Sequence, residues 1–135
     1  MTNLISAGIA FVLAFFPSQV SAETVPETVY VPQGLSSAQI IWLAKLMDCE
    51  SGVSTHALNP SDSNGLASRN ILQFQDATFD AFTVKYGIDV TRNDTAQEIS
   101  EAQVEIVSHW ILNQGEVRFE SQFPACVRKL GLPPA

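Results

Sequence analysis

Residues 36–52 read SSAQIIWLAKLMDCESG, and this stretch decides how the chain is expected to fold. Ser36 or Ser37 stands where a helix N-cap belongs, and Gln39 follows Ser36 at the spacing of a capping box. Apolar residues then recur at helical spacing and predict one buried stripe. Its members are Ile40, Leu43, Ala44 and Met47, widened by Ile41 and Trp42. Gly52 is well placed to end the helix.

Glu50 continues this stripe beyond Met47, at the carboxyl end of the predicted helix. The negative end of the helix macrodipole opposes an ionised carboxylate there, and apolar neighbours oppose it further. Such a carboxyl group keeps its proton near neutral pH, which is the property that a general acid needs to protonate a glycosidic oxygen. Glu50 is therefore the candidate catalytic residue, with an ordinary surface charge as the alternative.

The first 22 residues have the pattern of a signal peptide. An almost unbroken apolar run extends from Leu4 to Phe16, Pro17 breaks it, and Val20-Ser21-Ala22 supplies the small residues that precede a cut. The run is shorter than the roughly 20 residues of a membrane span. No Lys or Arg precedes it, so an uncleaved anchor is the alternative. We expect a secreted or periplasmic protein of the cell envelope, without a stable membrane span once the signal is cleaved.

Charge and cysteine content narrow the classes of function. The chain carries 14 acidic and 7 basic residues, and this net charge of −7 argues against nucleic-acid binding. Cys49 and Cys126 form the one possible pair in an exported chain, and their bridge would pin the end of the Glu50 helix to the C-terminal segment. The chain has no CxxC, and His56 and His109 are far apart, so we predict no metal site and no cofactor.

The rest of the chain predicts a mainly helical single domain over residues 36–135, preceded by an extended lead-in at 23–35. Residues 53–68 are rich in turn formers and predict a loop, or a short hairpin about Asn64-Gly65, between the first two helices. A second helix is expected from a cap at Asp76 to Gly87, and a third from a cap near Asp94 to Asn113. A short last helix begins at Pro124. Phe74 and Trp110 lie on apolar stripes and are expected in the core.

The order of several motifs resembles a known family. Glu50-Ser51-Gly52 is followed by Ala57, then by Ser68 with Ile71-Leu72-Gln73-Phe74, and then by Thr78-Phe79. This order resembles the lysozyme-like fold, and in particular its lytic transglycosylase branch. Cys49 beside the glutamate and the closing Cys126-Val127-Arg128-Lys129-Leu130-Gly131 resemble a small exported subgroup that joins those two points by a disulfide. The resemblance covers roughly Ile40 to Gly131.

The resemblance implies roles for particular residues. Glu50 would protonate the bridging oxygen of a β-1,4 glycan and then act as the base, taking a proton from the sugar's own 6-hydroxyl to give an anhydro product. Ser68 and Gln73 match positions that line the sugar cleft, although Ser68 could instead cap a turn and Gln73 could satisfy buried backbone groups. Ser51 could orient Glu50 or merely help to end the helix.

A hydrolase would need a second carboxylate. Asp62, Asp76 and Asp80 are the nearest acidic residues downstream, but Asp62 lies in the turn-rich loop and Asp76 is better explained as a helix cap. The one-carboxylate mechanism is therefore the expectation.

Two departures from the family pattern bear on activity. Asn70 stands where the family usually has Gly, and Asn is the next most tolerant residue of a positive φ. Residues 111–115 keep only Asn113 and Gly115 of a Tyr-Asn-Ala-Gly segment whose Tyr helps to hold the catalytic Glu.

The sequence thus predicts a monomeric enzyme that cleaves the N-acetylmuramic acid to N-acetylglucosamine bonds of peptidoglycan glycan strands, most simply a lytic transglycosylase. Asn70 and the absent Tyr favour an alternative, a weak or inactive glycan-binding or structural module of an envelope or phage assembly. A third hypothesis is an unrelated small helical exported protein in which Glu50 is only a surface charge.

Overall fold

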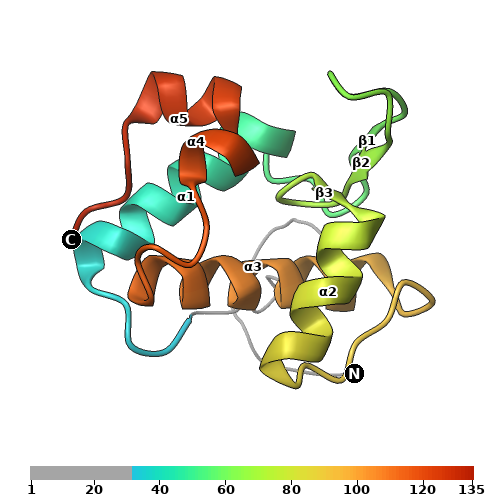
Figure 1. Cartoon of the computed structure of the whole chain (residues 1–135), viewed down its shortest axis with the longest axis horizontal. Coiled ribbons are helices and arrows are strands. Elements are labelled where there is room, and N and C mark those ends of the chain that lie inside the picture. Colours follow the sequence, from blue (N-terminus) through green and yellow to red (C-terminus); the bar gives the residue numbers. More distant parts are fainter. Residues whose placement is uncertain (1–31) are drawn as a thin grey trace, which may run out of the picture. The chain divides into compact units, whose positions relative to one another are not determined.

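A computed structural model describes residues 32–135, which all belong to one unit of the chain. Within these residues there are five helices and one small antiparallel sheet (Figure 1). In chain order they are α1 (Ser37–Ser51), β1 (Leu58–Asn59), β2 (Ser68–Arg69), β3 (Phe74–Gln75), α2 (Asp76–Tyr86), α3 (Ala96–Leu112), α4 (Phe119–Gln122) and α5 (Pro124–Leu130). The expected mainly α character agrees with this content. The predicted signal peptide at 1–22 and most of the lead-in at 23–35 lie outside the described residues.

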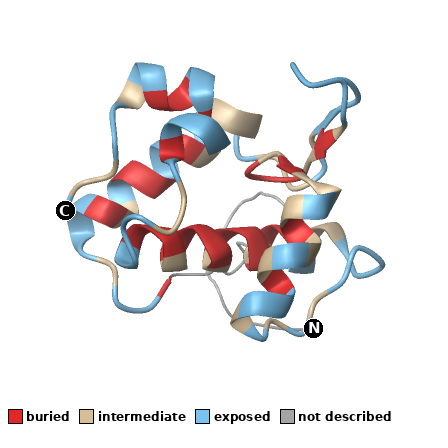
Figure 2. Cartoon of the chain, in the orientation of Figure 1, coloured by how far each residue is buried: buried red, intermediate tan, exposed pale blue. Residues whose placement is uncertain are grey.

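Helix α3 carries a large part of the core, because ten of its 17 residues are buried (Figure 2). Its start is fixed by a capping box in which the Thr95 hydroxyl accepts from the N–H of Glu98 and the Glu98 carboxylate accepts from the N–H of Thr95. The cap that the sequence places near Asp94 is Thr95, because the Asp94 carboxylate instead accepts the Thr91 N–H. Trp110 of α3 and Phe74 are both buried, as predicted, and their rings stack with centroids 5.5 Å apart.

Helix α1 begins and ends where the sequence predicts, with the Ser36 and Gln39 capping box at its start and Gly52 in the left-handed conformation at its end. Its buried face differs from the predicted one. The buried residues are Gln39, Trp42, Leu43 and Leu46, whereas Ile41 and Ala44 are exposed. The C-terminal segment decides this face, because Trp42 donates its indole N–H to the Gly131 carbonyl at 3.1 Å.

Helix α2 ends at Gly87 as predicted, but Asp76 is not its N-cap. Gln75 occupies the cap position without a side-chain bond, and Asp76 is the first helical residue. Its carboxylate is instead bonded to Arg69 and also pairs with Arg92. The cap prediction was wrong because these ion-pair partners come from other segments of the chain.

The turn-rich segment forms the hairpin that the sequence left as one of two choices. Strand β1 pairs with β2 in the register Asn59 to Ser68, and the turn closes where Gly65 donates its N–H to the Asp62 carbonyl at 2.8 Å. Strand β3, which the sequence did not predict, pairs with β2 and continues directly into α2. Successive side chains of a strand point to opposite faces, so Ser68 and Arg69 of β2 face different sites.

The predicted disulfide between Cys49 and Cys126 is present. It joins the last turn of α1 to α5, and these two helices pack side by side (Figure 1). The end of α1 that carries Glu50 is therefore held by a covalent bond. No helix in residues 32–135 combines the length and the apolar character that crossing a membrane requires.

Candidate catalytic site

Glu50 lies in the last turn of α1 and is partly buried. It follows buried Leu46 by one helical turn, so its side chain continues the buried stripe of α1. The pKa of Glu50 is raised from its ordinary 4.5 to about 7. Burial is the larger cause of this shift, and the negative charge of Asp62 is the smaller one. At neutral pH a large share of the Glu50 carboxyl groups is therefore protonated.

Asp62 is the second carboxylate of this site. It lies in the hairpin turn, where its Oδ2 accepts a hydrogen bond of 2.6 Å from the Ser68 hydroxyl and its Oδ1 accepts the Ser63 N–H at 2.8 Å. These two donors hold the pKa of Asp62 below its ordinary 3.8. Two nearby carboxyl groups thus have pKa values moved in opposite directions, a pattern that is typical of sites that pair a protonated acid with an ionised carboxylate.

The sequence alone does not favour Asp62 as a second acid, because Asp62 lies in the turn-rich loop. The predicted hairpin could have indicated that Asp62 and Ser68 are neighbours, because a turn about Asn64-Gly65 places these two residues on its two arms. Ser68 is only 1 % exposed, so its hydroxyl is a fixed donor to Asp62. This bond links the two arms of the hairpin, so it agrees with the alternative prediction that Ser68 stabilises a turn.

Ser51 ties the end of α1 to the turn between β2 and β3. Its hydroxyl donates to the Ile71 carbonyl at 2.7 Å, and its oxygen accepts the Ser54 N–H at 3.1 Å. The bonded residues Ser51 and Ile71 are 20 positions apart in sequence. Ser51 therefore positions the segment that carries Glu50, and no bond from its hydroxyl to the Glu50 carboxyl is present.

Three residues near the end of α1 and in the turn between β2 and β3 have a strained backbone. Three non-glycine residues in the described part have positive φ, namely Val53 at 63°, Asn70 at 69° and Gln73 at 54°. Val53 follows the end of α1, and the other two lie in the turn between β2 and β3. A left-handed conformation costs a non-glycine residue about 1–3 kcal/mol, least for Asn, and such strained residues cluster at functional sites. The strain thus supports a functional role for the two segments that meet at Ser51.

Gln73 lines a polar groove with a volume of about 250 Å³. Its Nε2 donates to the Asn70 carbonyl at 2.9 Å. The side chain therefore also provides a hydrogen bond to a backbone group, which is the alternative role that the sequence predicted. Among the other residues along the groove are Asn64, Gln75 and Gln122. Ser63, which is bonded to Asp62, lines one part of the groove, whereas Glu50 does not line it. The groove therefore reaches the hairpin turn, but neither Glu50 nor Asp62 lines it.

Asn70 adopts the left-handed conformation that the sequence predicts for this turn. Its side chain is 7 % exposed, and its Nδ2 donates to the Thr55 carbonyl at 2.7 Å. Asn70 also lines a second cavity, on the side of Arg69, which contains none of Glu50, Ser51, Ser68 and Gln73. Ser51 and Ser68 thus hold the two segments that carry Glu50 and Asp62, whereas Asn70 lines a different pocket.

Residues 32–135 contain no group of three or more His, Cys, Asp or Glu side chains arranged to hold a metal ion. No family model, no curated protein and no solved structure matches this chain.

Proposed function

We propose that the protein is an enzyme that cleaves the β-1,4 glycosidic bonds of peptidoglycan, with Glu50 as the general acid. The observation that carries the proposal is the partly buried Glu50 carboxyl group, whose pKa is raised to about 7 beside an ionised Asp62. A carboxyl group with that pKa can donate a proton at neutral pH and accept it back afterwards. Glycosidic bonds are the bonds for which a pair of such carboxyl groups is the usual catalytic device.

The first step is protonation of the bridging oxygen by Glu50 while the glycosidic bond breaks. Positive charge then develops on the sugar ring, and the ionised Asp62 carboxylate would stabilise that charge. Ser68 supports this role because its short hydrogen bond keeps Asp62 both oriented and ionised. In the second step the oxygen of water, or of the sugar's own 6-hydroxyl, bonds to the anomeric carbon, and the proton that this oxygen loses returns to Glu50.

The lysozyme-like fold remains part of this proposal. It is supported by one glutamate at the end of a helix, a hairpin that faces it, and a buried central helix. The polar groove lined by Gln73 would receive sugar units beside the cleavage point, where amide groups can bond hydroxyl and acetamido groups. An exported enzyme of the cell envelope would meet this substrate, and the disulfide suits such a compartment.

The decisive experiment compares the wild type with Glu50→Gln on purified peptidoglycan sacculi, with released fragments identified by mass spectrometry. Glu50→Gln should lose at least about 100-fold in rate, because amide cannot supply the proton. Glu120→Gln is the matched control, since Glu120 is exposed on α4. Equal activity of Glu50→Gln and the wild type would refute the proposal. Anhydro ends among the products would identify transglycosylation, and reducing ends would identify hydrolysis.

One observation favours the second candidate, a glycan-binding module without catalysis. The groove lined by Gln73 does not include Glu50, so binding there does not require the carboxyl pair. If the wild type releases no fragments but sediments with sacculi, and Gln73→Ala abolishes sedimentation, the binding module is the correct function.

A further inference from the structure

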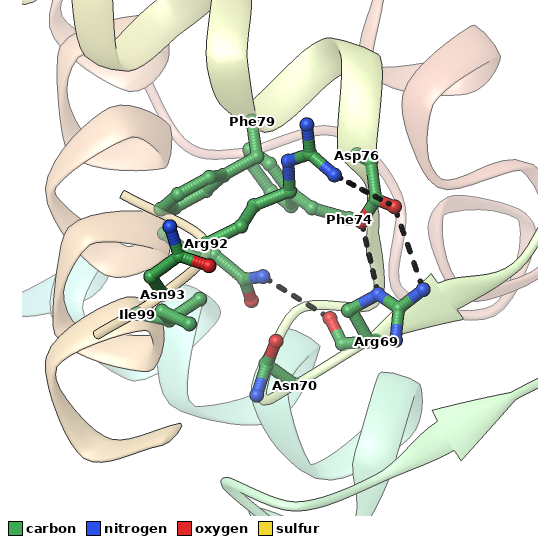
Figure 3. Close-up of a pocket in the computed structure, with 9 residues that line it drawn as sticks. Arg69, Asn70, Phe74, Asp76, Phe79, Arg92, Asn93 and Ile99 are labelled. Atoms are coloured by element: carbon green, nitrogen blue, oxygen red, sulfur yellow. Dashed lines mark hydrogen bonds and ion pairs between the residues drawn. The ribbon is translucent and has the colours of Figure 1, made fainter. Parts of the chain in front are cut away.

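Gln103 is a buried amide in the middle of α3, and both ends of its side chain are hydrogen-bonded to β2 and the turn that follows it. The residue is only 1 % exposed. Its Oε1 accepts the Leu72 N–H at 2.9 Å, and its Nε2 donates to the Arg69 carbonyl at 3.1 Å, a bond drawn as a dashed line in Figure 3. A polar side chain is costly to bury unless it is hydrogen-bonded, so these two bonds account for an amide on the buried face of α3.

Helix α3 makes a second polar contact to the same turn. Ser100 lies one helical turn before Gln103, is also buried, and accepts the Ile71 N–H through its hydroxyl at 3.4 Å. All of these bonds join residues that are 29 to 34 positions apart in sequence. The turn between β2 and β3 therefore takes its position from α3, which is itself held in the core by buried residues such as Trp110.

One end of this turn supports the segment that carries Asp62. Arg69, whose carbonyl is bonded to Gln103, follows Ser68 directly in β2. The Ser68 hydroxyl donates to Asp62 at 2.6 Å. A displacement of the Arg69 carbonyl would move Ser68 with it, because the two residues share a peptide bond, and would weaken the bond that orients Asp62.

The turn also supports the segment that carries Glu50. Leu72, whose N–H is bonded to Gln103, follows Ile71 directly. The Ile71 carbonyl accepts the Ser51 hydroxyl at 2.7 Å, and Ser51 is the neighbour of Glu50 in α1. One buried side chain on α3 is therefore connected to both segments of the carboxyl pair.

The strained backbone of the turn explains why it needs this support. Asn70 and Gln73 have φ values of 69° and 54°. Such conformations persist only where the surrounding structure holds them. Without the Gln103 amide, the Leu72 N–H would lack its partner in the buried interior, and the turn would gain by relaxing to a conformation that satisfies it.

We propose that Gln103 is a positioning residue that holds the turn between β2 and β3 in place and thereby sets the separation of the Glu50 and Asp62 carboxyl groups. It acts on one group through Ser51 and on the other through Ser68. Its importance for catalysis rests on the proposed function, in which these two carboxyl groups act on one glycosidic bond.

The test combines an NMR titration of the Glu50 and Asp62 carboxyl groups with the rate of fragment release from sacculi. Gln103→Met keeps the length of the side chain and removes both hydrogen bonds. The pKa of Glu50 should fall from about 7 toward its ordinary 4.5, because Glu50 becomes less buried and lies farther from the Asp62 charge. The pKa of Asp62 should rise toward its ordinary 3.8, because the Ser68 bond weakens. Cleavage should slow about 10- to 100-fold, as for a misplacement of about 1 Å.

Ser51→Ala is the second variant, and it decides the matter if Gln103→Met does not fold. It cuts the link between the turn and α1, so the pKa of Glu50 should fall while that of Asp62 stays unchanged. Gln97→Met is the matched control, because Gln97 lies in the first turn of α3 and its amide bonds within the same helix at 2.8 Å. This control should change neither pKa nor the rate of cleavage.

Unchanged pKa values in folded Gln103→Met overturn the proposal, as does a cleavage rate for this variant equal to that of an active wild type. An unchanged pKa of Glu50 in Ser51→Ala also overturns it. Thermal melting of each variant verifies folding. A wild type that releases no fragments refutes the proposed function instead, because the titrations need no substrate and still decide whether Gln103 positions the pair.

Discussion

Glu50→Gln should change the stability of the protein in a way that depends on pH. The pKa of Glu50 is about 7 in the folded protein and has an ordinary value of 4.5. The folded state therefore binds this proton more tightly than the unfolded state. As pH rises through the interval between the two values, ionisation of Glu50 destabilises the folded wild type, and the cost is complete above about pH 7. Glutamine does not ionise and avoids this cost.

The magnitude follows from the difference between the two pKa values, about 2.5. At about 1.36 kcal/mol per pH unit, the upper limit is about 3.4 kcal/mol. Glu50 is only partly buried, so solvent screens its charge and we expect roughly 1–2 kcal/mol. Glu50→Gln should thus be about as stable as the wild type near pH 4 and about 1–2 kcal/mol more stable near pH 8.5.

Urea denaturation of both proteins at the two pH values measures this difference directly. Glu120→Gln, which removes an exposed carboxylate, should show no such pH-dependent gain. A gap between Glu50→Gln and the wild type that is the same at both pH values would refute the reasoning. That result would mean that Glu50 is not desolvated, and the proposed general acid would lose its physical basis.

Three further predictions concern neighbouring features. Burial is the main cause of the raised pKa of Glu50, and Asp62→Asn removes the second cause, the Asp62 charge, so an NMR titration should place the Glu50 carboxyl at a lower pKa than in the wild type; an unchanged or higher value would contradict the coupling. Replacing Cys49 and Cys126 by Ser opens a loop with a sequence separation of 77 and should cost about 4 to 5 kcal/mol in the free energy of unfolding, whereas a loss below about 1 kcal/mol would show that the bridge adds little. Val53→Asn relieves a β-branched residue at φ 63° that is 55 % exposed, and urea denaturation should show a gain of about 1 kcal/mol; a loss would argue against strain there.

The ends of the helices could be predicted because they depend on residues a few positions apart. The capping box of Ser36 and Gln39, the stop at Gly52 and the start at Pro124 all agree with the sequence. The differences at Asp76 and near Asp94 have another origin, which is competition between partners for one side chain. Each side chain has a competing partner, Arg69 or the Thr91 N–H, and the cap pattern alone does not reveal which one it takes.

The sequence by itself determined Glu50 as the candidate acid, because its place at the end of a helix is a local property. It also determined the disulfide, because the chain has only two cysteines. Only the tertiary structure decided which face of α1 is buried, that Asp62 stands near Glu50, and that Asn70 turns toward a different cavity. Those outcomes depend on which distant segments pack together, and packing energy is shared among residues that are far apart in the chain.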